Sequence, residues 1–388
     1  MTGPGQTRLA NLSRLHGPGV RHTSRRFVMR IAFVSAHYSP FVGGVESHIV
    51  QIATRMARDG HEVAVVTHQE ADRDLPDNEI VDGVLVHRFP VPVPSRNYAF
   101  SPKMLGFLRH RGADFDVVHA HGYHALPALA SAVLRRGALV FTPHYHGTGH
   151  SPFRKLLHRP YRQLGKVIFE RADRTIAVSP PEARLIVSHF PQTEARLTVI
   201  PNGVDQTRLS AADPFLLNEH VVLSAGRIET YKQVDKTIAA MKHLPEQYVL
   251  RVTGDGGARP DVESLTLELG LEKRVTFLGR VSDDDLYRWL RTASVYVSMS
   301  SNEAMPVTFI EALAAGARVV ASDIPAHQDL VTKTRGAITL VPLAADPSAV
   351  AAAIEDRMAA PVPTARVDSW DDVTNETLDL YREILGQR

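Results

Sequence analysis

Short apolar runs alternate with longer amphipathic stretches in the first half of the chain. The short runs are rich in β-branched residues, which is typical of strands buried on both faces of a parallel sheet. The longer stretches repeat their apolar residues at helical spacing. Strands are predicted at residues 31–35, 62–67, 84–89, 117–120, 139–141, 175–178 and 197–200, and helices at residues 44–59, 123–136, 153–172 and 182–189.

The same alternation restarts after the turn sequence Pro201-Asn202-Gly203. This pattern predicts an α/β fold with two doubly wound, Rossmann-like domains that face each other across a cleft, where ligands bind beyond the carboxyl ends of the strands. The domains are expected at residues 29–205 and 206–365, and residues 366–388 are expected to form a helix that packs back on the first domain. Strands are predicted at residues 221–225, 249–253, 275–278, 295–298, 318–322 and 338–341, and helices at residues 261–269, 283–292 and 370–385.

Composition agrees with a two-domain globular protein. The chain has 388 residues, of which 44% are hydrophobic and 22% are charged. It has no cysteine, which excludes a disulfide framework and Cys-ligated zinc and fits a cytoplasmic location. The net charge of +2 is too small to predict a nucleic-acid partner. No apolar run approaches the roughly 20 residues of a membrane span.

Residues 1–28 differ from the remainder of the chain. They are rich in Gly, Arg, Ser and Thr and lack the apolar core of a secretion signal. We expect this extension to be disordered. A basic targeting or membrane-contact arm is the alternative, and Met29 is an alternative start site because a predicted strand follows it directly.

Two glutamates separated by seven residues, Glu303 and Glu311, stand at the centre of the second half. Pro306 is expected to be the first residue of a helix, and Gly316 is expected to end that helix. Glu303 then lies on the preceding loop, where free backbone N–H groups favour a phosphate. Glu311 lies inside an apolar helix, and a buried glutamate without a partner is rare. The alternative is a helix-capping glutamate and an internal ion pair.

Four further loops follow predicted strands. Gly43-Gly44 opens a helix, and Gly254-Asp255-Gly256 permits a tight turn beside a ligand. Arg227 and Lys232 suit a diphosphate through their charge. The backbone at Arg280 and Val281 is placed to contact a base, with Ser282 or Asp283 as a helix cap. Neither a G-x-G-x-x-G nor a P-loop sequence occurs, which argues against standard dinucleotide and P-loop enzymes.

Histidines gather at the ends of two consecutive strands. His119 and His121 project to one side of the first of these strands, and His144 and His146 follow the next one. His124 and His150 lie nearby in the sequence. Such a cluster predicts either a metal site or hydrogen bonds to a polar substrate.

The chain resembles the retaining glycosyltransferases of family 4, also called group 1, which have the GT-B fold. The resemblance extends from about Met29 to Asp329. Gln233, Ala304 and Met305 depart from it, since glycine is common at these positions in the family, and these departures are expected to affect donor-sugar preference. The matching stretches are residues 43–46, 116–121, 199–205, 225–227 with Lys232, 254–256 and 303–311.

The resemblance implies that the protein transfers a sugar from a UDP- or GDP-linked donor to a hydroxyl of a glycan, lipid-linked or small-molecule acceptor, without a metal or other cofactor. It implies that Arg227 and Lys232 neutralise the diphosphate and the leaving group. Glu303 would hold a hydroxyl of the donor sugar, Glu311 would bind the ribose, and His121 would contact the sugar. Further donor contacts are implied for Gly44, Gly254, Arg280, Val281, Ala304, Met305, Pro306 and Val307.

Residues 153–174 carry a basic face and an apolar face. The simpler interpretation is an amphipathic helix packed on the sheet. The alternative is peripheral contact with anionic lipid at the inner face of the membrane through Arg154, Lys155 and Arg159. Other functions that stay open are a nucleotide-sugar epimerase of the same fold, a metal-dependent hydrolase centred on the histidines, and a non-catalytic nucleotide-sugar binder.

Overall fold

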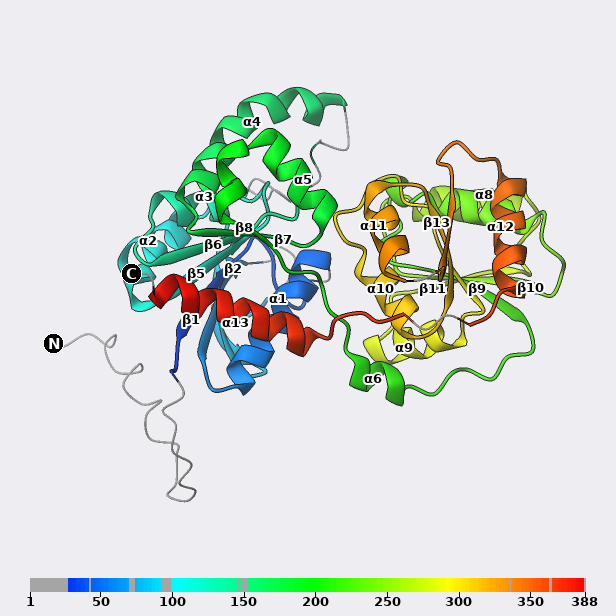
Figure 1. Cartoon of the computed structure of the whole chain (residues 1–388), viewed down its shortest axis with the longest axis horizontal. Helices are drawn as coiled ribbons and strands as arrows, with labels where there is room; N and C mark the ends of the chain where they lie inside the picture. The colour runs from blue at the N-terminus through cyan, green and yellow to red at the C-terminus, as the bar shows by residue number, and fades with distance from the viewer. Residues whose placement is uncertain are drawn as a thin grey trace, which may run out of the picture.

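The computed structural model consists of two α/β domains that lie next to each other along the long axis of the molecule (Figure 1). It describes residues 27–41, 43–69, 74–92, 99–145, 147, 152–334, 336–362 and 365–386. Of residues 152–161 it describes only the backbone. Residues 1–26, which make up nearly all of the N-terminal extension predicted to be disordered, lie outside the described part of the chain.

The first domain is built on an eight-stranded sheet in the order β3-β4-β2-β1-β5-β6-β7-β8. Neighbouring strands are parallel except β3 and β4. Successive strands are added to one side of β1 as far as β4, and then to the other side from β5 onward. The switch point of the sheet therefore lies between the parallel strands β1 and β5, and the loops that follow these two strands meet there. The strands are β1 (Arg30–Val34), β2 (Glu62–His68), β3 (Asn78–Val81), β4 (Val84–Phe89), β5 (Val117–His121), β6 (Ala138–Thr142), β7 (Arg174–Ala177) and β8 (Leu197–Val199).

Helices cover both faces of this sheet. One face is covered by α1 (Gly44–Arg58) and by the C-terminal helix α13 (Trp370–Gly386), whose buried Trp370 and Tyr381 belong to the same core cluster as Ile49 and Ile52 of α1. Figure 1 shows α13 returning to the first domain after the second one is complete. The other face is covered by α2 (Pro102–Arg111), α3 (Leu126–Val133), α4 (Pro152–Arg171) and α5 (Pro180–His189).

The second domain has a six-stranded, wholly parallel sheet in the order β11-β10-β9-β12-β13-β14. Numbered within the domain, this is the 3-2-1-4-5-6 order of a dinucleotide-binding fold, with its switch point between β9 and β12. The strands are β9 (His220–Ala225), β10 (Tyr248–Thr253), β11 (Val275–Gly279), β12 (Val295–Ser298), β13 (Arg318–Ser322) and β14 (Ile338–Val341). The helices are α6 (Gln206–Ala211), α7 (Val234–Met241), α8 (Arg259–Glu268), α9 (Asp283–Thr292), α10 (Val307–Ala314), α11 (Pro325–Lys333) and α12 (Pro347–Ala359).

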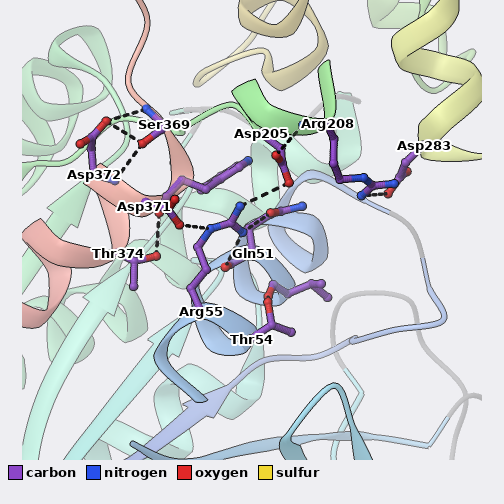
Figure 2. Close-up of polar contacts among 12 residues, drawn as sticks. Gln51, Thr54, Arg55, Asp205, Arg208, Asp283, Ser369, Asp371, Asp372 and Thr374 are labelled. Carbon is purple, nitrogen blue, oxygen red and sulfur yellow. Dashed lines mark hydrogen bonds and ion pairs between the residues drawn. The ribbon is translucent and has the colours of Figure 1, made fainter. Parts of the chain in front are cut away.

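The two segments that cross between the domains run together. Val204 N donates to Asp368 O at 2.9 Å, and Trp370 N donates to Val204 O at 3.3 Å. A Cβ on Gly203 would lie 2.5 Å from Trp370 N, so only glycine allows the segments to approach this closely. Figure 2 shows Arg55 of α1 reaching both segments, with Nε 2.7 Å from Asp371 Oδ1 and Nη2 3.4 Å from Asp205 Oδ2.

The predicted strands are all present, and the main differences concern helices and boundaries. The helix that contains Glu311 begins at Val307, and Pro306 is its extended N-cap with ψ of 105°, so the prediction of Pro306 as the first helical residue is wrong. The predicted helix 123–136 is shorter because Tyr123 and His124 lie in a turn before α3. Ser282 is the N-cap of α9 as expected, with Oγ 3.1 Å from Asp285 N. Elements that the sequence did not predict are β3, α2, α6, α7, α11 and α12.

Candidate functional site

Lys232 and Glu303 meet at the switch point of the second sheet. Lys232 ends a short 3₁₀ turn in the connection after β9, and Glu303 lies on the loop between β12 and α10. The Nζ atom lies 2.5 Å from Oε1, and the two side chains are 21% and 10% exposed. Burial alone would raise the pKa of Glu303, but the Lys232 charge and hydrogen bonds from Lys232 and Ser300 outweigh it and lower that pKa. Glu303 is therefore a carboxylate held beside a cation.

Tyr231 connects the two basic residues of this site. Arg227 Nη2 donates a hydrogen bond to the Tyr231 hydroxyl at 3.0 Å, and Lys232 Nζ lies 5.5 Å from the centre of the Tyr231 ring. The backbone N–H of Ser301 donates to Tyr231 O at 2.7 Å, which fastens the turn to the loop that carries Glu303. Tyr231 was missed by the sequence reasoning, although its place between Arg227 and Lys232 was a usable signal.

The loops after β9, β10 and β11 are packed backbone against backbone. Gly226 N donates to Thr253 O at 3.1 Å, and Gly254 N donates to Gly279 O at 2.7 Å. A Cβ on Gly254 would lie 2.0 Å from Gly226 O, and one on Gly256 would lie 2.3 Å from Ile228 O. These glycines are therefore required by contact with the neighbouring loop, rather than only by approach of a ligand as the sequence suggested. The packing fixes the position of Arg227.

A small cavity of about 20 Å³ lies between these loops and β12. Gly226, Arg227, Lys232, Tyr296 and Ser300 are among the residues that line it. Arg280 is exposed and Val281 is half-buried at the end of β11, on the same edge of the sheet. The expected donor-binding residues of the second domain therefore gather at the carboxyl ends of its strands.

Glu311 is buried inside α10, as the sequence predicted, and is 7% exposed. Among the described residues its carboxylate has no hydrogen bond or ion pair. Burial, and then the nearby charges of Asp283 and Asp205, raise the pKa of Glu311 to about 8, while Arg208 acts in the opposite direction. A buried carboxyl group with free hydrogen-bonding capacity is suited to receive the hydroxyl groups of a ligand.

His327 is a second residue that the sequence reasoning missed. It lies in the first turn of α11 and is stacked on Phe309 at 4.8 Å. Its Nδ1 lies 2.8 Å from Ser322 O, so Nδ1 carries the proton, whereas Nε2 is buried and has no partner among the described residues. The charges of Glu303 and Lys232 both act on its pKa, which burial lowers. His327 thus lies within electrostatic reach of the ion pair with a free acceptor nitrogen.

The loop before α10 also contacts the first domain. Ser179 Oγ donates to Ala304 O at 2.8 Å, and Asn202 N contacts Met305 Sδ at 3.2 Å. Val307 packs against the core cluster that contains α1 and α13. Ala304 and Met305, where the family often has glycine, therefore take part in the domain interface. They are placed to affect how the domains come together as well as the donor sugar.

The first domain contributes its histidines at the ends of β5 and β6. His119 is a structural residue, with Nδ1 2.5 Å from the Tyr381 hydroxyl and Nε2 2.7 Å from Thr142 Oγ1. His121 is wholly buried beside His48 and His144, and neither of its ring nitrogens has a partner among the described residues. Burial, followed by the neighbouring histidines, holds the pKa of His121 far below its usual value, so the ring is neutral.

The two glycines of the Gly43-Gly44 turn differ in the space around them. A Cβ on Gly43 would lie 2.2 Å from Glu46 Oε2, whereas one on Gly44 would meet nothing within 4 Å. The space beside the backbone of Gly44, the first residue of α1, is therefore open to a ligand.

Three expectations remain partly outside the described residues. No group of three His, Asp or Glu side chains in the described part of the chain is arranged to hold a metal ion, while His146 and His150 are outside it. The side chains of Arg154, Lys155 and Arg159 are also undescribed. No helix among the described residues is long and apolar enough to span a membrane.

Two family sequence profiles match adjoining parts of the chain. The profile described as Glycosyltransferase Family 4 matches residues 42–208, and the one described as Glycosyl transferases group 1 matches residues 205–367. The chain belongs to the group 1 glycosyltransferases of family 4. This confirms the resemblance drawn from the motifs and assigns the protein to sugar transfer from a nucleotide sugar.

Individual relatives agree with this assignment. A D-inositol 3-phosphate glycosyltransferase from Mycobacterium sp. (strain JLS) is 30% identical over 335 residues, which cover 76% of this chain and 75% of the relative. A sucrose-phosphate synthase from Thermosynechococcus elongatus has a similar structure, with a TM-score of 0.78 and 23% identity over 93% of this chain and 100% of its own. Anabaena HepE in complex with UDP and glucose gives a TM-score of 0.70 and 20% identity, covering 91% and 99%. These structures confirm the GT-B fold of two Rossmann-like domains.

Proposed function

We propose that this glycosyltransferase is a retaining, metal-independent enzyme that transfers a hexosyl group from a UDP- or GDP-sugar to a hydroxyl of a glycan, a glycolipid or a small molecule. The observation that carries the proposal is the Lys232–Glu303 ion pair at the switch point of the second sheet, with Arg227 beside it through Tyr231. Two cations next to a carboxylate match a diphosphate next to a sugar hydroxyl.

Each group has a separate role in this proposal. Arg227 and Lys232 neutralise the diphosphate, and the N–H groups of the loop from Ala304 to Val307 at the start of α10 add the positive end of the helix dipole. Glu303 exchanges part of its contact with Lys232 for a hydroxyl of the donor sugar. Glu311 accepts hydrogen bonds from the ribose hydroxyls, and Gly44 approaches the diphosphate from the first domain.

Retention of configuration follows from attack on the face that the leaving group occupies. The bond from the sugar anomeric carbon to the diphosphate oxygen breaks as the bond to the acceptor oxygen forms on the same face. The acceptor proton passes to the departing phosphate oxygen, so no side-chain nucleophile is required. Closure of the domains excludes water from the reacting centre. Since His121 is buried, it contacts the sugar only if the neighbouring loops of the first domain move.

Similar proteins guide the choice of substrates to test. HepE is described in complex with UDP and glucose, which makes UDP-hexoses the first donors to test. The mycobacterial relatives are named for D-inositol 3-phosphate, which makes a phosphorylated polyol a soluble acceptor to test. We further propose a cytoplasmic enzyme that contacts anionic membrane peripherally. Loss of charge at Arg154, Lys155 and Arg159 is then expected to weaken liposome flotation, and unchanged flotation contradicts that contact.

The test is release of nucleoside diphosphate from a panel of UDP- and GDP-sugars, with D-inositol 3-phosphate or an alkyl glucoside as acceptor, with and without EDTA. Acceptor-dependent release that survives EDTA, and a product with the anomeric configuration of the donor by NMR, support the proposal. Interconversion of free sugars without an acceptor indicates an epimerase. Hydrolysis that is lost in EDTA and unaffected by Glu303→Ala indicates a histidine metal site. Binding without any turnover indicates a nucleotide-sugar binder.

A further inference from the structure

A groove of about 410 Å³ runs between α2 and α3 of the first domain, on the face of the sheet opposite α13. Its walls are almost entirely apolar, and its volume falls within the range of small-molecule sites. Two of its apolar side chains, Phe100 and Val133, are half-exposed at 49% and 53%. The groove also includes Met104, Leu105, Leu126 and Leu129.

Gly106 keeps one wall of this groove open. It lies in the interior of α2, where glycine costs about 1 kcal/mol relative to alanine. A Cβ at this position would meet nothing within 4 Å, and the φ angle of Gly106 is not positive. Neither crowding nor backbone conformation therefore requires glycine here. A larger apolar residue would favour the helix and fill the groove, so the open space is what this residue provides.

One end of the groove is polar and faces the catalytic edge. His68 is the last residue of β2 and is 4% exposed, and its Nδ1 has no partner among the described residues. Burial, and then His37, lower the pKa of His68 to about 4, so the ring is neutral. Leu126, at the same end, opens α3 only five residues after His121. Arg109 lines the opposite end. On the side of the reacting centre the groove therefore ends at a neutral hydrogen-bonding side chain that is almost wholly buried.

We propose that this groove holds the alkyl chain of an amphiphilic acceptor, whose hydroxyl-bearing head lies at the His68 end. The inference rests on the glycosyltransferase function proposed above and names the chemical class of its acceptor. From its N-cap Ser101 to Arg109, α2 runs beside the groove for eight helical steps, or about 12 Å, which suits an extended chain better than a single ring. Burial of the chain supplies affinity, and His68 orients the head.

The test compares octyl β-D-glucoside with methyl β-D-glucoside by calorimetry on the full chain, below the micelle concentration. The wild type is expected to bind only the octyl compound. Gly106→Leu fills the groove and is expected to weaken that binding at least tenfold while the melting temperature stays equal or rises. His110→Leu places the same side chain on an exposed part of α2 outside the groove and is expected to bind as the wild type does.

Four binding results each overturn the inference, and a fifth result, from a truncated chain, follows them. The four are no binding of the octyl compound, equal binding of the methyl compound, equal binding of phenyl β-D-glucoside, or unchanged affinity in Gly106→Leu. Recovery of binding only after removal of residues 1–26 also contradicts it, since the groove then holds the chain's own N-terminal segment. UDP binding measured on the same variants separates the two proposals. If the wild type binds neither UDP nor GDP, the proposed function is refuted, whereas the groove is judged by octyl glucoside alone.

Discussion

Lys232 and Glu303 form a salt bridge of 2.5 Å in the free protein, at the point where the donor sugar and its diphosphate are proposed to bind. The pair holds both side chains in place before a ligand arrives, because each is mostly shielded from water and has the other as its partner. When a donor binds, the diphosphate gives Lys232 a second anion and the sugar gives Glu303 a hydroxyl. The site is thus preorganised for the charge that develops on the leaving group.

Replacing Lys232 alone is expected to lower the free energy of unfolding more than replacing both Lys232 and Glu303. Lys232→Met leaves the Glu303 carboxylate buried without a cation and should lower the free energy of unfolding by roughly 1–3 kcal/mol in urea titrations. The double variant Lys232→Met/Glu303→Gln should recover at least half of that loss. Both variants should lose transfer activity by more than about 100-fold. Equal stability of the single variant and the wild type contradicts a structural role for the pair.

Glu311 predicts a pH dependence of stability. The folded protein holds its proton up to about pH 8, whereas an unfolded glutamate releases it near 4.5, so the folded state binds more protons between these values. Stability therefore falls as the pH rises through this window. Glu311→Gln should match the wild type near pH 4.5 and be more stable at pH 8, by at most about 4 kcal/mol. Urea unfolding at the two pH values measures the difference, and an identical offset at both contradicts the assignment.

The same group predicts how nucleotide binding responds to pH. If the carboxylate accepts the ribose hydroxyls, the affinity for UDP should increase between pH 6.5 and pH 8.5 as Glu311 loses its proton. Ionisation of the β-phosphate of UDP also increases affinity with pH, and the variant Glu311→Gln shows how much of the increase belongs to the phosphate. In Glu311→Gln the dependence that belongs to Glu311 should disappear and the affinity should fall. Calorimetric titrations of both proteins at the two pH values decide the point.

The backbone conformation of Gln233 leads us to expect that its glycine variant is more stable than its alanine variant. It has a left-handed backbone, with φ of 49° and ψ of 45°, and its buried Oε1 has no partner among the described residues. Left-handed backbone costs a non-glycine residue roughly 1–2 kcal/mol. Gln233→Gly should therefore be about 1 kcal/mol more stable than Gln233→Ala, although alanine is the better helix former. Thermal or urea unfolding measures this order, and the reverse order shows that the turn relaxes.

Arg55 allows the contribution of the domain connection to catalysis to be measured. It joins α1 to Asp205 and Asp371 on the two crossing segments, and its side chain is only 11% exposed (Figure 2). Arg55→Ala should lower kcat/KM about tenfold while UDP affinity changes much less, because Arg227, Lys232 and Glu311 of the proposed nucleotide site lie in the second domain. Arg58→Ala, on an exposed position of the same helix, is the matched control. An equal loss in both variants contradicts a specific role of the connection.

The fold could be predicted from the sequence because parallel sheets produce a strong signal. The buried strands are short, mostly apolar runs with many β-branched residues, and every predicted strand is present. β3 was missed because its residues are partly exposed and pair antiparallel at the edge of the sheet. α7 was missed because it follows Gln233, whose left-handed backbone is not signalled by a glycine.

The candidate site was predicted in part, through charged residues that follow strands. Arg227, Lys232 and Glu303 gather as expected, and Glu311 is buried in a helix as expected. Tyr231 and His327 were missed because Tyr231 is an uncharged residue that acts through its hydrogen bond to Arg227, and His327 lies inside a helix rather than on a loop after a strand. The different hydrogen bonding of His119 and His121 could not be predicted either, since the partner of His119 is Tyr381 on the C-terminal helix.

The most direct measurement is thermal unfolding with UDP, GDP, ADP and NAD, each with and without EDTA, on the wild type and Arg227→Ala. A ligand at about 100 times its dissociation constant adds roughly 2.7 kcal/mol, which shifts the melting temperature by several degrees. We predict selective stabilisation by UDP or GDP that is unaffected by EDTA and lost in Arg227→Ala. No shift with any nucleotide, together with destabilisation by EDTA, would contradict the nucleotide-sugar site and direct attention to the histidines of the first domain.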